Sequence, residues 1–332
     1  MEKIFDRLAT VLTTVALTLV ATVATPLTTR AETRPHTKNT IRHATLDRCK
    51  VLTQHACGPW RLSLRNGKRI TLADAQVHPR DKRGKPILER MAAMAISGQG
   101  RQVAYIRAAD HRIVVRDLGG DVHVMPRKSL PTRGDDVTLR LSLDGTYLAI
   151  DNQIFDVNRG VKLAELPWEA TIEGFSGDGN EVLTVKPLKD ERLELTSYSL
   201  RGELLARATL KSDDEPTAYS YVPYALGTDG HTVAHLTTNT GGGSVEIIDL
   251  ITGEIVRNVK VKMGIFYSGR LQLVFIADWI TADELTVYLE EEGPTTPSPI
   301  RVLEINLTTG KITTRERYKF RDNVFGYEAC GG

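Results

Sequence analysis

The stretch "LSLDGTYLAIDNQIFDVNRGVKL" (residues 141–163) contains two tight turns, each flanked by short apolar segments. The first turn contains Asp144 and Gly145, and the second ends at Gly160. Aspartate accepts backbone hydrogen bonds within such turns, and glycine adopts a conformation that would strain other residues. The flanking residues alternate or are β-branched, which is typical of strands. The stretch therefore predicts strand, Asp-Gly turn, strand, loop, strand, glycine turn, strand.

The same arrangement recurs along the chain and indicates an internal repeat. Relatives of the first turn are "ISGQGRQVAYI" (96–106), "FSGDGNEVLTV" (175–185), "LGTDGHTVAHL" (226–236) and "ITADELTVYL" (280–289). The copies that retain Asp-Gly predict the structural turn residues Asp144, Gly145, Asp178, Gly179, Asp229 and Gly230. The glycine of the second turn recurs as Gly67, Gly120, Gly160, Gly202, Gly253 and Gly310.

Four antiparallel strands in about 45 residues is the pattern of a propeller blade. Six copies of the second turn accompany five of the first, so the copy with Gly67 lacks an inner half upstream. The C-terminal "RDNVFGYEAC" (321–330) is expected to supply it, which would remove exposed sheet edges. We therefore predict an all-β protein: a single β-propeller of six four-stranded blades, closed by strands from both chain ends. Seven blades are the alternative. The most helix-like segment (87–96) is assigned to an inner strand.

The segments "SLDGTYLAI…IFDVNRG" and "GTDGHTVAHL…VEIIDLITGE" resemble repeats of the TolB-type and WD-repeat-like propellers common in exported bacterial proteins. "CGPWRLSLRNGKRITLADA" and "SGQGRQVAYIRAADHRIVVRDLGG" are similar to secreted propellers of actinobacteria. The resemblance implies a propeller fold over nearly all of the mature chain. It does not imply one function, because such propellers include scaffolds, binders and enzymes.

The N-terminal segment has the layout of a secretory signal. Lys3 and Arg7 precede an apolar stretch from Leu8 to Ala24, and small residues follow. We expect a signal peptide over residues 1–31, a polar linker over 32–48 and the propeller over 49–332 of a secreted or cell-surface protein. The alternative is a retained membrane anchor carrying a sensor ectodomain, since the apolar stretch is almost long enough to span a bilayer.

Three cysteines follow the N-terminal segment: Cys49, Cys57 and Cys330. In an exported protein they allow one disulfide and one leftover thiol. Cys57 is expected to open the first strand and Cys330 to end the last one. Ring closure therefore predicts the disulfide Cys57–Cys330, with Cys49–Cys57 as the pairing that would contradict it.

The usual local signatures of cofactor, metal and catalytic sites are weak in this sequence. Gly98 and Gly100 imitate a dinucleotide-binding turn, but no helix is expected to follow them. The turn aspartates lie in different hairpins and are interpreted as turn residues rather than calcium ligands. On a strand, His231 and His235 would lie about 13 Å apart. We predict no cofactor, no metal and no catalytic residue.

The loops between second and third strands are expected to emerge on one face of the propeller. They are residues 107–112, 151–152, 186–192, 237–244 and 290–299, joined there by connections such as "AYSYVPY" (218–224). Loops carry recognition more often than strands do, and tyrosine combines apolar area with a polar tip. The candidate binding residues are Tyr219, Tyr221, Tyr224, Arg107, Asp110 and Lys189. The alternative for the tyrosines is packing between blades.

The composition is that of an ordinary globular protein, with 41% hydrophobic and 25% charged residues. A formal net charge of +2 argues against nucleic-acid binding, which needs a concentrated positive face. We therefore expect a monomeric, non-enzymatic exported propeller that binds a protein, peptide or glycan through one face. The alternative is a hydrolase or lyase with a dispersed or metal-dependent site in the central channel.

Overall fold

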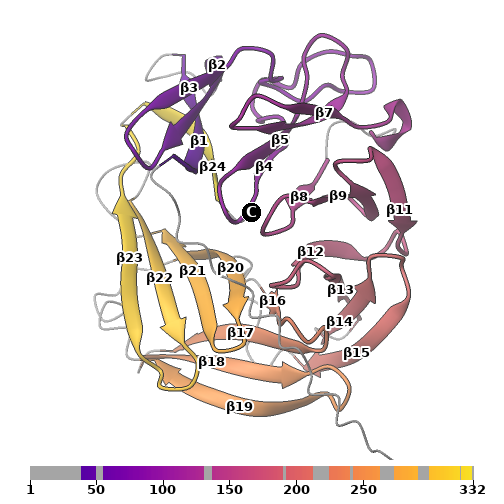
Figure 1. Cartoon of the computed structure of the whole chain (residues 1–332), viewed down its shortest axis with the longest axis vertical. Coiled ribbons are helices and arrows are strands. Elements are labelled where there is room, and N and C mark those ends of the chain that lie inside the picture. Colours follow the sequence, from indigo (N-terminus) through magenta and orange to yellow (C-terminus); the bar gives the residue numbers. More distant parts are fainter. Residues whose placement is uncertain are drawn as a thin grey trace, which may run out of the picture. The chain divides into compact units, whose positions relative to one another are not determined.

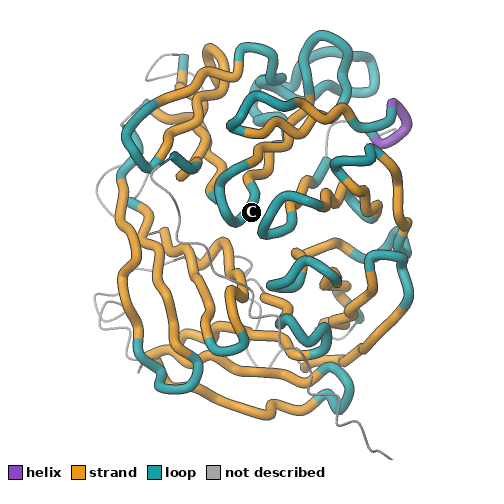
Figure 2. Tube along the Cα trace, in the orientation of Figure 1, coloured by secondary structure: helices purple, strands orange, loops and turns teal. Residues whose placement is uncertain are grey.

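Six four-stranded antiparallel sheets surround a common axis in the computed structural model (Figure 1). The structure describes residues 39–49, 55–130, 137–189, 192–211, 224–239, 242–261, 273–290, 299–321 and 323–330. All of them lie in the unit formed by residues 33–332. The prediction of a six-bladed propeller is confirmed. Strands and loops account for nearly all of the described chain, and its one helical turn is the short 3-10 helix η1 (Arg127–Ser129) (Figure 2).

Each blade has an innermost, a second, a third and an outer strand. The innermost strands are β24 (Val324–Ala329), β4 (Met94–Ile96), β8 (Leu139–Leu141), β12 (Thr171–Phe175), β16 (Tyr224–Leu226) and β20 (Leu273–Thr281), for blades 1 to 6. The second strands are β1 (Ile41–Arg48), β5 (Gln102–Ile106), β9 (Tyr147–Ile150), β13 (Glu181–Pro187), β17 (Thr232–Asn239) and β21 (Glu284–Glu290).

The other two strands of each blade complete the sheets in the same order. The third strands are β2 (Ala56–Leu64), β6 (Ile113–Asp117), β10 (Gln153–Asp156), β14 (Arg192–Ser199), β18 (Gly242–Asp249) and β22 (Ile300–Asn306). The outer strands are β3 (Arg69–Leu72), β7 (Val122–Val124), β11 (Val161–Glu165), β15 (Leu204–Lys211), β19 (Glu254–Val261) and β23 (Ile312–Tyr318).

The turn after β8 shows why the repeat folds into hairpins. The Ser142 hydroxyl accepts a hydrogen bond from the backbone N–H of Tyr147 at 3.0 Å, and the Asp144 carboxylate accepts one from the backbone N–H of Thr146 at 2.9 Å. Gly145 adopts a φ of +82°, a conformation that glycine reaches without strain. The side chains thus satisfy backbone donors that the tight turn leaves unpaired.

The ring closes through β24, which pairs antiparallel with β1. The expected closure by strands from both chain ends is confirmed, but the C-terminus supplies only the innermost strand. The second strand is Ile41–Arg48, so the predicted linker is wrong from Ile41 onward. This segment lacks a polar–apolar alternation because it lies between β24 and β2, and even His43 and Thr45 are buried.

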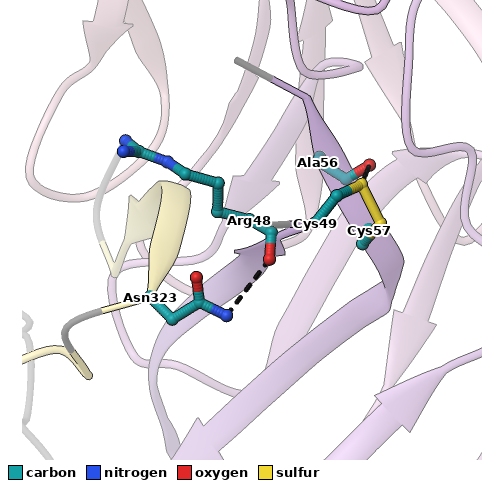
Figure 3. Close-up of a disulfide and its surroundings, with 5 residues drawn as sticks. All are labelled: Arg48, Cys49, Ala56, Cys57 and Asn323. Atoms are coloured by element: carbon teal, nitrogen blue, oxygen red, sulfur yellow. Dashed lines mark hydrogen bonds between the residues drawn. A yellow bond between two sulfur atoms is a disulfide. The ribbon is translucent and has the colours of Figure 1, made fainter. Parts of the chain in front are cut away.

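The predicted disulfide Cys57–Cys330 is wrong, because Cys57 is bonded to Cys49, with 4.6 Å between their Cα atoms (Figure 3). Strand β24 runs antiparallel to β1, with Val324 beside Asp47 and Ala329 beside His43. Cys57 lies opposite Asp47, so Cys330 is at the other end of the blade, more than about 13 Å away. The Cys330 thiol is free and buried, and it donates to the carbonyl of Gly98 at 3.0 Å.

Apolar side chains fill the spaces between neighbouring blades, as between the facing sheets of blades 5 and 6. The turns joining first to second and third to fourth strands lie on one face of the ring, which we call the turn face. The loops joining second to third strands, and the connections between blades, lie on the other, the loop face. The helix-like segment 87–96 contributes only β4, Met94–Ile96. Within the described ranges, no helix is both long and apolar enough to cross a membrane.

Candidate functional site

Two of the predicted binding residues, Arg107 and Asp110, pair with each other in the β5–β6 loop. The Arg107 guanidinium donates to both Asp110 carboxylate oxygens, at 2.9 and 2.6 Å. These hydrogen bonds are the main reason that the pKa of Asp110 is lowered to about 2. The pair therefore shapes its own loop, in blade 2.

The other predicted binding residues belong to blades 4 and 5 or lie outside the described residues. Lys189 is exposed after β13, and Tyr224 begins β16. The Tyr224 ring stacks on His235 with 4.5 Å between centroids, and burial, together with the nearby carboxylates of Glu173 and Glu246, raises the pKa of Tyr224 to about 12. Tyr219 and Tyr221 lie outside the described residues. The structure does not bring Arg107 and Asp110 together with Lys189 or Tyr224.

A tryptophan that sequence reasoning missed is the most exposed large apolar side chain of the described residues. Trp168 is 84% exposed, in the connection from β11 to β12 on the loop face. Hydrogen bonds fix this connection on both sides of Trp168. The Asn152 side-chain amide donates to the Leu166 carbonyl at 2.5 Å, and the Ala170 N–H donates to the Pro167 carbonyl at 3.1 Å. The chain therefore presents the indole on a short, anchored segment.

Four charged residues of the innermost strands form a second feature, which we call the channel layer. It consists of Arg140, Glu173, Asp278 and Glu328. Strand pairing places them at one level: Arg140 beside Ala149, Asp278 beside Thr286 and Glu328 beside Ala44 in the second strands. Glu173 lies at the corresponding point of β12, where the register shifts. The layer thus draws one residue from each of blades 3, 4, 6 and 1.

The positive charge of Arg140 acts on all three carboxyl groups of the channel layer and favours their ionised forms. Blade 6 lies opposite blade 3 in the ring of six, so the interaction between Arg140 and Asp278 runs across the axis (Figure 1). The hydrogen bonds of Arg140 go elsewhere: its Nε donates to the Glu173 carbonyl at 3.1 Å and its Nη1 to the Leu139 carbonyl at 3.2 Å.

Burial opposes ionisation in this layer. It raises the pKa of Asp278 to about 7, although Arg315 and Arg140 act in the other direction. It likewise raises the pKa of Glu328 to about 7, against Arg140. Burial also raises the pKa of Glu173, which Arg140 and a hydrogen bond from the Tyr224 backbone N–H partly offset. Near neutral pH, the layer therefore contains two carboxyl groups close to their midpoint of ionisation.

Arg315 lies behind the channel layer, on the outer strand β23. It reaches inward across its blade and donates to the Tyr288 hydroxyl at 3.0 Å and to the Thr286 hydroxyl at 3.3 Å. Among the residues that the structure describes, no group of three or more histidine, cysteine, aspartate or glutamate side chains is placed to hold a metal ion. The layer is thus a set of carboxyl groups around one guanidinium.

No family model matches the sequence, and no curated protein matches it. Solved structures with a similar fold include a putative TolB from Agrobacterium tumefaciens, at 11% identity over 84% of this chain and 89% of that chain, with a TM-score of 0.45. TolB from Acinetobacter baumannii matches at 11% identity over 87% of this chain and 66% of that one, with a TM-score of 0.42. Hydrazine synthase from Kuenenia stuttgartiensis matches at 16% identity over 67% and 64%, with a TM-score of 0.41.

Proposed function

We propose that the protein is a binding module that takes a protein, peptide or glycan on its loop face, with Trp168 as the anchor. The observation that carries this proposal is the 84% exposure of Trp168 on a hydrogen-bonded connection. Tryptophan is seldom so exposed, and it is enriched among the residues that dominate binding energy. Its rigid ring offers a large apolar surface and one N–H donor at little cost in conformational entropy.

Tryptophan fluorescence tests this proposal directly. The chain has three tryptophans, and Trp60 and Trp279 are buried, so aqueous iodide will quench Trp168 selectively. A photo-crosslinking residue in place of the exposed Pro167, next to the intact Trp168, should capture the ligand from native culture medium or cell-surface extract. The same residue at Ile251, which is 68% exposed in a turn on the opposite face, is the matched control.

The captured ligand should protect Trp168 from iodide, and Trp168→Ala should weaken its binding by about 30-fold or more, as for a hot-spot residue. Ile251→Ala should leave the affinity unchanged. Equal capture from both positions, or unchanged affinity in Trp168→Ala, would contradict the loop face as the binding surface.

A second candidate function is that of a hydrolase or lyase acting in the channel. The two carboxyl groups with a pKa of about 7, Asp278 and Glu328, favour it, because general acids and bases work best near the operating pH. Activity against hydrolase and lyase substrates should then vanish in both Asp278→Asn and Glu328→Gln. Activity that survives in either variant would rule out this pair as the catalytic groups.

We also propose that the protein is exported. The apolar segment from Leu8 to Ala24 and the disulfide Cys49–Cys57 support this, since disulfides persist in oxidising compartments. N-terminal sequencing of the protein from its native source should find a start near residue 32, and alkylation without reductant should label no cysteine other than Cys330. A chain in the cytosol with Met1 and three free thiols would contradict export.

A further inference from the structure

The connection from blade 1 to blade 2 is far longer than the propeller requires. Residues 73–93 join β3 to β4, whereas residues 166–170 suffice to join β11 to β12. The long connection is anchored on blade 2. The Gln76 N–H donates to the Ile106 carbonyl at 2.8 Å, and His111 Nδ1 lies 2.9 Å from the Gln76 side-chain oxygen. It is thus an ordered addition to the loop face.

The middle of this connection, residues 79–86, is a hairpin with a basic tip. The Asp81 carboxylate accepts hydrogen bonds from the backbone N–H groups of Arg83 and Lys85, both at 2.8 Å. The Asp81 N–H also donates to the Lys85 carbonyl at 2.8 Å. The single acidic side chain of the hairpin is therefore held by backbone donors, while its four basic side chains are exposed: Arg80, Lys82, Arg83 and Lys85.

The next connection in the ring, from β7 to β8, adds two basic residues. Arg127 and Lys128 of η1 are exposed there. Blade 2 links this connection to the hairpin's own: His111 contacts the first, and the neighbouring Arg112 guanidinium donates to the Met125 carbonyl of the second at 2.6 Å. Both connections lie beside β7 at the edge of the ring (Figures 1 and 2). We call their exposed cations the basic surface: Arg80, Lys82, Arg83, Lys85, Arg127 and Lys128.

The charge of the basic surface is not compensated within the described part of the chain. None of its members forms an ion pair with another residue that the structure describes. Residues 79–86 alone carry a net charge of +3, although the whole chain carries only +2. Clustered positive charges repel one another and attract anions. The near-neutral overall composition therefore conceals a local positive excess that suits an anionic partner.

We infer that the basic surface docks the protein on a bilayer that contains anionic lipids. Half of its cations are lysines, a residue type depleted in protein interfaces, and residues 73–93 contain no phenylalanine, tyrosine or tryptophan on which bases could stack. Its cations occupy two separate connections, which suits a flat array of phosphate headgroups. Leu88, 39% exposed in the same connection, is placed to enter the boundary between headgroups and acyl chains. Docking does not involve Trp168, which lies in another connection.

Co-sedimentation of the full exported chain with lipid vesicles tests the inference. One set of vesicles consists of phosphatidylcholine alone, and the other also contains about 30% phosphatidylglycerol. Binding should require phosphatidylglycerol, and it should weaken at least about tenfold when sodium chloride rises from about 0.05 to about 0.5 M, because salt screens the attraction. Insertion of the apolar N-terminal segment would instead give equal binding to both kinds of vesicle, with little response to salt.

Charge-removing variants locate the docking surface. Each basic residue near an anionic bilayer strengthens binding about fivefold, so replacing Lys82, Arg83 and Lys85 together with glutamine should weaken it about 100-fold. Arg127→Gln with Lys128→Gln should weaken it about 25-fold. The matched control replaces three exposed cations of the turn face with glutamine and should change the affinity less than about threefold. These control residues are Lys68, Arg201 and Lys311.

All of these side chains are exposed, so the urea midpoints of the variants should match that of the wild type. Poly-L-glutamate and dextran sulfate test the other anionic partners. Equal binding to both kinds of vesicle, or an equal loss in the turn-face control, would overturn the inference. Tighter binding to either polymer than to the anionic vesicles would also overturn it, and would assign the basic surface to an acidic protein segment or an acidic glycan.

Discussion

The two faces of blade 6 meet their neighbours in different ways. Toward blade 5, the second strand β21 presents Leu285, Val287 and Leu289, which join a continuous apolar cluster. Toward blade 1, the same strand presents Thr286 and Tyr288, which face a network of arginines and aromatic rings. A single strand thus serves an apolar interface on one face and a polar interface on the other.

The polar interface is the one that closes the ring. Arg65 of blade 1 donates to Glu316 of blade 6 at 3.2 Å, although 251 residues separate them, and Arg42 forms an ion pair with the same carboxylate. His43 stacks on Tyr318 with 4.9 Å between ring centroids. Apolar packing tolerates small shifts, whereas hydrogen-bonded ion pairs require one geometry. The interface between blades 5 and 6 therefore depends on buried apolar area, whereas the closing interface adds hydrogen-bonded ion pairs that select one register.

The largest expected effect comes from removing apolar area between blades 5 and 6. Trp279 of β20 is 6% exposed in that cluster, so Trp279→Ala should lower the free energy of unfolding by about 3–5 kcal/mol. Trp168→Ala makes the same change at an exposed position and should alter the free energy of unfolding by less than about 0.5 kcal/mol. Urea denaturation measures both. If both variants lost similar amounts of unfolding free energy, burial of the tryptophan side chain would not decide the size of the loss.

A smaller loss is expected when the closing network is broken. Glu316→Gln leaves Arg42 and Arg65 without their carboxylate in a mostly buried setting, which should cost about 3 kcal/mol. Replacing all three residues with methionine or leucine should recover most of that stability, since apolar substitutes for buried ion pairs are often neutral. A triple variant as unstable as Glu316→Gln would show that the ion pairs contribute net stability, and would remove the contrast with the apolar interface.

The smallest expected effect is a pH dependence of stability that arises at the closing interface. Burial, reinforced by Arg42, Arg69 and Arg65, lowers the pKa of His43 to about 3, below its usual 6.5. The unfolded chain therefore takes up a proton first as the pH falls, and His43 should cost about 2 kcal/mol of stability at about pH 5 relative to about pH 8.

The variant His43→Phe isolates this effect. The raised pKa of Asp278 and Glu328 acts in the opposite direction, since protonation below about pH 7 relieves their burial. That contribution is the same in both proteins, so the difference between their urea midpoints reports His43 alone. Parallel pH profiles for the two proteins would contradict a buried neutral imidazole at the closing interface.

The architecture was predictable because it depends on local patterns that repeat. The Asp-Gly and glycine turns fix hairpins from a few residues, and their unequal numbers pointed to closure by both chain ends. Strand β1 was missed because a strand buried on both faces loses the alternation that reveals strands. The disulfide was predicted incorrectly because closure brings β24 beside β1 antiparallel, which sends Cys330 to the end remote from Cys57.

The channel layer was not predictable from motifs, because its residues are spread from Arg140 to Glu328 and each occupies an ordinary strand position. For Arg140 and Asp278, a signal existed in the repeat itself, at the position before the apolar residue that opens the first turn. In blade 6, that turn is one residue shorter: Trp279 pairs with Leu285, whereas Ile96 pairs with Val103. Aligning Ile280 with Ile96 therefore hid Asp278. Trp168 lies in a connection between blades, where the repeat makes no prediction.

The order of the strands in blade 1 has a consequence for synthesis of the chain. Strands β1 to β3 leave the ribosome early, but their inner partner β24 follows about 250 residues later. At a synthesis rate of about 5–20 residues per second, the inner edge of β1 stays unpaired for roughly 10–50 s until β24 has been made. Cys49 and Cys57 are only 8 residues apart, so their bond can form during this interval. Where the chain emerges into an oxidising compartment, this bond covalently joins the β1–β2 hairpin while the inner edge of β1 is still unpaired and open to association with other chains.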